Sequence, residues 1–236
     1  MGSPEIWCTR LGLVPYAEAL ELQRSLEASR LAGELPDLLL LLEHPPTYTR
    51  GRRTRDDELP MGEQWYGMQG IEVAEADRGG HVTYHGPGQL VGYPIVSLRP
   101  YGDGVHEYVR RMEQVIVRSL AAFGTEAGLH EGLTGVWTSE PAKIASIGIH
   151  VSRGITRHGF AVNVNNDLQP FEWIVPCGID HCRMTSVTRE TGSEQDMEAF
   201  MNVVSEQFGS VYGRRPVAAP LEQLGIASSS RAVARA

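Results

Sequence analysis

Apolar positions recur at helical spacing in three parts of the chain. They predict a first helix over 15–33, a second over 105–123 and a third over 197–211. The second segment carries the most regular apolar stripe and ends just before a glycine. Ser193 precedes the third segment and Asp196 follows three residues later, a spacing that is typical of a capping box at the start of a helix.

Between these helices the pattern changes to that of strands. The run Leu38–Leu42 is wholly aliphatic and lies between turn-forming residues, which predicts a strand buried on both faces. Apolar and polar residues alternate over 145–151 and again over 160–164, as expected for neighbouring antiparallel strands. Because helices and strands do not alternate regularly, we expect an α+β fold: a single domain with a mixed, mainly antiparallel sheet packed with helices.

The end of the chain differs in composition from the rest. From Val217 onward Ala, Pro and Ser dominate and no periodicity is visible. We therefore expect one domain over 1–216 and a flexible C-terminal tail over 217–236.

Charge and composition narrow the class of protein. The chain has 236 residues, 42% of them hydrophobic, and 29 acidic against 21 basic residues give a net charge of −8. This balance predicts a globular protein and argues against broad contact with nucleic acid. No apolar run is long enough to cross a bilayer, and three cysteines do not make a disulfide framework. We expect a cytoplasmic protein with no membrane contact.

The densest chemical signal is the segment Arg78–Gln89, which contains four glycines, two histidines and an arginine. Glycines allow a backbone to approach a ligand closely, although a bulged hairpin would have a similar composition. The segment matches neither the P-loop nor the dinucleotide fingerprint, so nucleotide phosphate binding is not supported.

Cys177 lies between Pro176 and Gly178, a turn-like setting that leaves its thiol accessible to a substrate. It is a candidate nucleophile, whereas a small buried residue is the commoner role of a lone cysteine. A zinc site would use Cys177, His181 and Cys182, but this compact trio fits structural zinc spacings poorly, and we expect no metal.

A thiol nucleophile needs a group that favours the thiolate, because a thiol with a pKa near ~8.5 is mostly protonated at neutral pH. Lys143 shares the phase of the apolar residues over 145–151, which directs its ammonium group toward the apolar side or a cleft; a solvated position before the strand is the alternative. His85 and His158 are rival bases, although His158 shares a face with Phe160 and so resembles a buried, hydrogen-bonded histidine.

Several of these motifs together resemble the lipoyl(octanoyl) transferase family. The resemblance rests on Arg78–Gln89, on Lys143-Ile-Ala-Ser-Ile-Gly148, on His158-Gly-Phe-Ala161 and on Pro176-Cys177-Gly178, in this order and spacing. It implies a fold like that of biotin and lipoate protein ligases, with Cys177 and Lys143 as the catalytic pair. It also implies a substrate pocket formed by Arg78, Gly79, Gly80, His81, Val82, Thr83, Tyr84, His85, Ser146, Ile147, Gly148, Gly159, Phe160 and Ala161.

The activity implied by this resemblance is transfer of an octanoyl group, by way of a thioester on Cys177, from octanoyl-acyl carrier protein to a lysine of a lipoyl domain. The acceptors would be lipoyl domains of 2-oxoacid dehydrogenases and the glycine cleavage H protein, and no cofactor is needed because the thioester is already activated. An ATP-dependent lipoate or biotin protein ligase is the alternative, and a non-catalytic acyl-protein or redox-binding module is a third interpretation.

Four arginines, Arg50, Arg52, Arg53 and Arg55, form the densest basic cluster in the chain. Because acyl carrier proteins are acidic, the cluster could steer the donor toward the pocket. The alternative is a solvated loop whose arginines balance the acidic residues that follow at 56–58.

Overall fold

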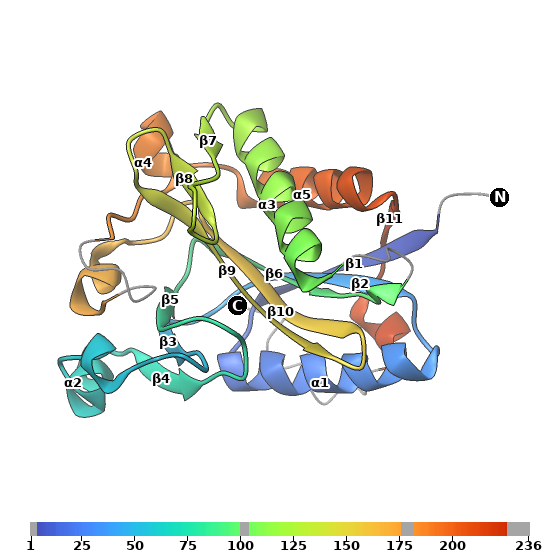
Figure 1. Cartoon of the computed structure of the whole chain (residues 1–236), viewed down its shortest axis with the longest axis horizontal. Helices are drawn as coiled ribbons and strands as arrows, with labels where there is room; N and C mark the ends of the chain where they lie inside the picture. Colours follow the sequence, from blue (N-terminus) through green and yellow to red (C-terminus); the bar gives the residue numbers. More distant parts are fainter. Residues whose placement is uncertain (1–3, 100–103, 176–181, 226–236) are drawn as a thin grey trace.

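Two β-sheets of unequal size organise the chain (Figure 1). The computed structural model describes residues 4–99, 104–175 and 182–225. The larger sheet has eight strands in the order β11-β1-β2-β6-β10-β9-β8-β7, and the smaller has three in the order β4-β3-β5. The strands of the large sheet are β1 (Glu5–Leu13), β2 (Asp37–Glu43), β6 (Gln89–Ile95), β7 (Ala127–Gly128), β8 (Val136–Thr138), β9 (Lys143–Ser152), β10 (Ile155–Asn163) and β11 (Arg215–Ala218), and those of the small sheet are β3 (Thr47–Arg50), β4 (Glu72–Glu75) and β5 (Thr83–His85).

The large sheet is mixed and mainly antiparallel, as the sequence predicts. Strand β1 runs parallel to both β2 and β11, whereas the remaining neighbours pair antiparallel. The predicted antiparallel pair over 145–151 and 160–164 is confirmed as β9 and β10. Both residues of the tight turn that joins them, Arg153 and Gly154, have positive φ, as a type I′ hairpin requires.

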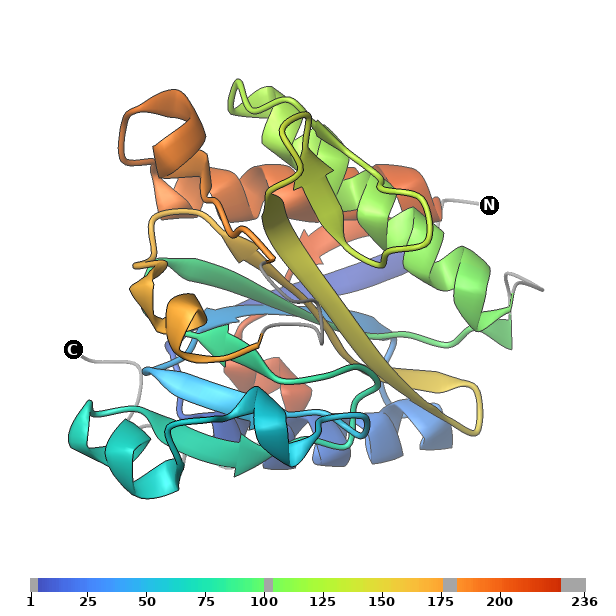
Figure 2. The ribbon, with the colours of Figure 1, turned by 60° about the vertical axis from the view of Figure 1, so that its left-hand side comes forward.

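The three predicted helices are present, and they cover both faces of the large sheet. Helix α1 (Tyr16–Ala32) lies on one face, and α3 (Val105–Ala122) and α5 (Met197–Tyr212) lie on the other (Figure 2). The short helices are α2 (Glu63–Met68) and α4 (Val187–Thr191), with 3₁₀ turns η1 (Asp56–Glu58), η3 (Gln169–Trp173) and η5 (Leu221–Leu224). The start of α5 differs from expectation: its cap is Asp196, whose carboxylate accepts hydrogen bonds from the backbone N–H groups of Glu198 and Ala199.

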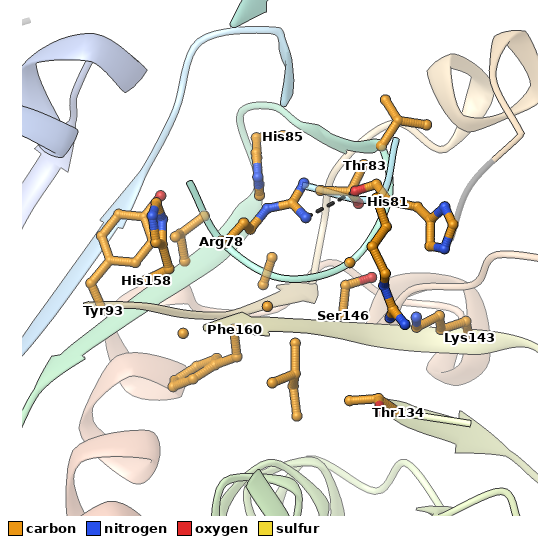
Figure 3. A pocket seen from close by; sticks show the side chains of 18 of the residues that line it. Arg78, His81, Thr83, His85, Tyr93, Thr134, Lys143, Ser146, His158 and Phe160 are labelled. Atoms are coloured by element: carbon orange, nitrogen blue, oxygen red, sulfur yellow. Dashed lines mark hydrogen bonds between the residues drawn. The ribbon is translucent and has the colours of Figure 1, made fainter. Parts of the chain in front are cut away.

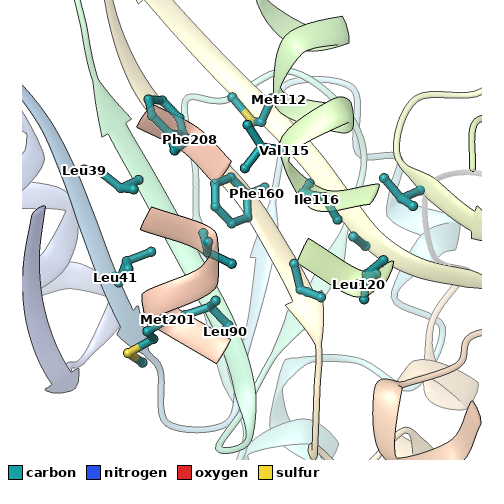
Figure 4. Packing of buried hydrophobic residues seen from close by; sticks show 14 of the residues in the cluster. Leu39, Leu41, Leu90, Met112, Val115, Ile116, Leu120, Phe160, Met201 and Phe208 are labelled. Carbon is teal, nitrogen blue, oxygen red and sulfur yellow. The ribbon is translucent and has the colours of Figure 1, made fainter. Parts of the chain in front are cut away.

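Strand β2 shows why a wholly aliphatic run is needed at the centre. Leu39 and Leu41 pack into the core under α3 and α5, whereas Leu38, Leu40 and Leu42 pack into the core under α1. The predicted burial on both faces is therefore confirmed. Phe160 of β10 occupies the first core, where it lies among side chains of α3 and α5 (Figure 4).

The first part of the segment expected as a flexible tail, 217–236, is structured. Residues 215–218 form β11, which pairs with β1, and Leu224 of η5 is buried in the core under α1. The polar, proline-containing sequence hides these contacts because an edge strand of four residues is too short to show a periodicity. Residues 226–236 lie outside the described residues.

In the part of the chain that the structure describes, no helix combines the length and the apolar character that a bilayer crossing requires.

Candidate active site

A pocket of about 210 Å³ lies between the glycine-rich segment, which leads into β5 of the small sheet, and strands β6, β9 and β10 of the large sheet. It is lined by residues from three of the predicted motifs, which are far apart in the sequence: the glycine-rich segment, the start of β9 and the middle of β10. Figure 3 shows His158 and Tyr93 at one end of this pocket and His81 and Lys143 at the other. The fold therefore brings the separate motifs to one place.

Most predicted pocket residues line this cavity. They are Arg78, Gly80, His81, Val82, Thr83, His85, Ser146, Ile147, Gly148, Gly159, Phe160 and Ala161, together with Lys143. Gly79 and Tyr84 do not line it. Gly79 donates its backbone N–H to the carbonyl of Ile149, and the Tyr84 ring packs on Tyr48 and Phe171 under the small sheet. Alternation along β5 explains the second difference, because Thr83 and His85 face the pocket and the residue between them must face away.

Arg78 holds the glycine-rich segment in shape. One guanidinium nitrogen, Nη2, donates to the carbonyl of Thr49 at 2.8 Å and to its hydroxyl at 2.7 Å, and Nη1 donates to the carbonyl of His81 at 2.9 Å. The arginine is 8% exposed and crosses β9 at Gly148, where a Cβ would lie 2.8 Å from its Cδ. A glycine is therefore required at 148 for the guanidinium to reach these partners.

Lys143 is buried at the first position of β9, with 4% of its surface exposed. Its Nζ lies 5.4 Å from the centre of the Trp137 ring, and its Cε lies 2.7 Å from where a Cβ on Gly135 would be. Glu113 of α3, also fully buried, accepts the backbone N–H of Gly135 at 3.0 Å and so fixes the loop over the lysine. The structure places Lys143 in the cleft and not in solvent.

The chain on both sides of Cys177 is anchored beside this pocket. Val175 donates its N–H to the carbonyl of Glu58 at 3.0 Å. Beyond the cysteine, the N–H of Lys143 donates to the carbonyl of Arg183 at 2.8 Å, and the N–H of Thr185 donates to the carbonyl of Lys143 at 3.0 Å. Cys177 itself lies outside the described residues, as does His181 of the zinc trio considered above.

Two buried histidines give the Tyr93 end of the pocket its electrostatic character. His44 donates from Nδ1 to the carbonyl of Val14 and accepts from the Tyr93 hydroxyl at Nε2, and burial lowers its pKa from 6.5 to about 4. His85 donates from Nδ1 to Gln89, and burial together with His44 lowers its pKa well below the usual value. Both rings are therefore neutral at pH 7.

His158 is hydrogen-bonded and buried, as the sequence indicates. Its Nε2 lies 2.6 Å from a carboxylate oxygen of Asp77, and its backbone N–H donates to the side chain of Gln23. Burial lowers the pKa of His158, and the hydrogen bonds from His158 and Arg157 hold the pKa of Asp77 below its usual range. Both pKa shifts are those expected for a neutral imidazole that donates a hydrogen bond to an ionised carboxylate.

His81 is paired with a buried carboxylate, that of Glu58. Its Nδ1 lies 2.6 Å from Oε1 of Glu58, which is fully buried. The other carboxylate oxygen accepts the backbone N–H of Val82 at 3.3 Å. Sequence reasoning placed His81 in the pocket but missed Glu58, because nothing in an acidic run distinguishes one buried carboxylate from its solvated neighbours.

Further lining residues were not predicted as pocket residues from the sequence: Tyr16, Arg53, Val91, Tyr93, Gly132, Leu133, Thr134 and His158. Two of them, Val91 and Tyr93, belong to a strand that is buried along its whole length, where periodicity cannot show which side chains reach a cavity.

The arginine cluster divides in the structure. Arg50 is paired with Asp56, Glu63 and Glu75, and Arg55 is paired with Asp57 and Glu58. Arg53 is exposed and lines the pocket. Arg50 and Arg55 therefore fit the alternative interpretation, in which neighbouring carboxylates balance the charge of the arginines.

Comparison with known proteins decides the family. The model of the lipoyl protein ligase A/B catalytic domain matches residues 15–209. The chain belongs to this family. A curated octanoyltransferase of Acidobacterium capsulatum is 45% identical over 219 residues, which cover 87% of this chain and 89% of the relative. An octanoyltransferase of Rubrobacter xylanophilus is 49% identical over 204 residues, which cover 86% of this chain and 91% of the relative. The predicted membership is confirmed.

Solved structures of lipoate protein ligases confirm the predicted lipoate-ligase-like fold. A bi-partite lipoate protein ligase of Thermoplasma acidophilum aligns with a TM-score of 0.75 at 18% identity, over 94% of this chain and 89% of that one. Lipoate-protein ligase A bound with ATP aligns with a TM-score of 0.69 at 15% identity, over 94% of this chain and 91% of that one.

Within the described residues no three His, Cys, Asp or Glu side chains gather as metal ligands. The pocket offers instead an ammonium group, an imidazole held by a carboxylate and several backbone groups. This set suits proton transfer and binding of an oxyanion.

The neutral state of His44 predicts an acid-sensitive fold. Its folded-state pKa lies below its unfolded value, so the unfolded chain binds the extra proton as the pH falls below about 6.5. Stability should therefore fall between pH 6.5 and pH 4, with about 3 kcal/mol of the loss from His44. Urea unfolding across this range should show a shallower pH dependence in His44→Gln.

His106→Gln, which changes an exposed histidine, is the matched control and should keep the wild-type pH dependence. An unchanged pH dependence in His44→Gln would contradict the assignment of a neutral His44.

Proposed function

We propose that this chain transfers an octanoyl group from octanoyl-acyl carrier protein to a lysine of a lipoyl domain, in lipoate biosynthesis, through a thioester on Cys177. The acceptors are lipoyl domains of 2-oxoacid dehydrogenases and the glycine cleavage H protein, and the reaction takes place in the cytoplasm. The observation that carries the proposal is the position of Lys143, which is buried in the pocket and joined by its backbone to the segment after Cys177. The curated octanoyltransferases support the choice of acyl group.

The first half-reaction acylates the enzyme. The Cys177 thiolate attacks the thioester carbonyl, and the carrier's thiolate leaves as the new thioester forms. The ammonium group of Lys143 stabilises the attacking thiolate and then gives its proton to the leaving sulfur. If this ammonium group lowers the thiol pKa by about two units, the thiolate gains ~2.7 kcal/mol and becomes the major form at neutral pH.

The second half-reaction discharges the acyl group to the acceptor lysine. The neutral amine attacks the thioester, the Cys177 thiolate leaves, and the nitrogen gives a proton to the neutral amine of Lys143. Lys143 is thereby restored to the ammonium form with the thiolate beside it. One lysine serves both half-reactions.

An ATP-dependent ligase is the competing function, because solved structures with this fold include lipoate ligases. Such an enzyme would activate a free acid as its adenylate and would not carry the acyl group on Cys177. The curated relatives that match most of this chain are octanoyltransferases, which favours the thioester route.

Mass spectrometry should locate the intermediate. After incubation with octanoyl-acyl carrier protein, intact wild-type protein should gain one octanoyl group on Cys177, because a thiolate is the nucleophile. Cys177→Ser should gain none and should transfer none, since a serine hydroxyl is not ionised by the same lysine.

Cys8→Ser and Cys182→Ser change the other two cysteines and should retain the adduct and the activity. Full activity in Cys177→Ser, or an adduct on another residue, would refute the assignment.

Lys143→Arg should separate the two half-reactions. Arginine keeps the positive charge that supports the thiolate but cannot accept a proton near neutral pH. Single-turnover measurements should show some acylation of Cys177 and a fall in discharge of about 100-fold or more. Lys143→Met, which removes the charge as well, should impair both steps; equal losses of the two steps in Lys143→Arg would contradict the dual role.

Arg53 lies at the pocket and should contact the phosphate of the carrier's phosphopantetheine arm. Arg53→Glu should raise the KM for octanoyl-acyl carrier protein and weaken its salt dependence. The same variant should use octanoyl-pantetheine, which lacks both phosphate and carrier, almost as well as wild type does. Steady-state kinetics with the two donors make the comparison.

Arg118→Glu makes the same charge change on an exposed residue of α3 and is the matched control. Equal losses with both donors would show that Arg53 supports the pocket instead of the arm.

A further inference from the structure

We propose that His81, oriented by Glu58, is a second proton acceptor of this site and takes the first proton from the incoming lysine. The inference rests on the function proposed above and assigns a residue to a proton that Lys143 cannot take. His81 is then a catalytic residue and Glu58 is a positioning residue.

The proton count of the reaction leaves one proton for a second acceptor, either a side chain of the site or solvent. The acceptor lysine enters as an ammonium ion, with a reference pKa of ~10.4, and ends as an amide nitrogen, so it loses two protons. Lys143 gives one proton to the leaving thiol of the carrier and can take one back. The other proton must go to a different acceptor.

The geometry makes His81 that acceptor. Its Nδ1 donates to Oε1 of Glu58 at 2.6 Å, so the acceptor nitrogen of the neutral ring is Nε2. The His81 side chain is 21% exposed and lines the same pocket as Lys143. A proton taken from the substrate can therefore pass on to solvent.

Charged groups surround His81. The buried Glu58 carboxylate of η1 accepts the ring N–H, and Arg55 lies 3.6 Å from the same oxygen. Arg78 donates to the His81 carbonyl, and Arg53 and Lys143 line the same pocket.

Glu58 also joins this histidine to the nucleophile's segment. Its side chain holds His81, and its backbone carbonyl accepts the N–H of Val175, two residues before Cys177. Glu58 is thus a shared anchor of the His81 side chain and of the Val175 backbone.

The acceptor lysine loses its two protons to two different groups. The acceptor ammonium gives one proton to Nε2 of His81, which becomes an imidazolium paired with Glu58. The neutral amine forms the new C–N bond, the C–S bond to Cys177 breaks, and the nitrogen gives its second proton to Lys143. The imidazolium releases its proton to water, so each transfer releases one proton overall.

Single-turnover kinetics of His81→Gln test the inference. Glutamine can still donate to Glu58 but does not titrate. Discharge to a lipoyl domain at pH 7 should fall about 100-fold, and acylation of Cys177 should fall far less. The deficit should close as the pH approaches ~10, because the acceptor amine then arrives already neutral.

Two further variants sharpen the result. Glu58→Gln keeps a hydrogen-bond acceptor for His81 but removes the charge, and should slow discharge more than acylation. His106→Gln replaces an exposed histidine outside the pocket and should match wild type in both steps.

Normal discharge in His81→Gln, an equal loss of acylation, or a deficit that persists unchanged at high pH would each overturn the role of His81. If the wild-type enzyme itself formed no acyl adduct, the proposed function would fail, and this inference would fail with it.

Discussion

Two backbone hydrogen bonds between Lys143 and residues 183–185 determine the architecture of the site. They join the first residue of β9 to the chain that returns from Cys177, as a short parallel bridge outside the regular strands. Because the backbone is held from this side, the Lys143 side chain extends into the pocket, where its Nζ lies 5.4 Å from the centre of the Trp137 ring and Gly135 leaves space for its Cε. A buried ammonium group is costly, and the face of an aromatic ring offsets part of that cost.

The pocket is electrostatically uneven along its length. At the Tyr93 end the histidines His44 and His85 are held neutral by burial, so they add polar contacts without adding charge. At the other end lie Lys143, the exposed Arg53 and the His81–Glu58 pair. Under the proposed function, the reacting carbonyl would lie at the end that holds Lys143.

Sequence reasoning succeeded where one local pattern determines the outcome. The helices, the doubly buried β2 and the β9–β10 hairpin follow from apolar periodicity, and most of the glycine-rich segment lies with Lys143 along one pocket. It failed where partners come from distant segments. Glu58 looks like any acid in a charged turn until His81 is brought to it, and Leu224 looks like part of a tail until α1 provides its core. Tyr84 was expected in the pocket with its neighbours, but the alternation of side chains along β5 turns it away from the cavity.

The most direct test of the account is a chase of the isolated acyl-enzyme. Wild-type protein is loaded with labelled octanoyl groups from acyl carrier protein, separated from the carrier, and mixed with a lipoyl domain in the absence of ATP. The account predicts that the label leaves Cys177 and appears on the lipoyl lysine within a single turnover. A label that stays on the enzyme, or that reaches the lysine only when ATP and free octanoate are added, would contradict it.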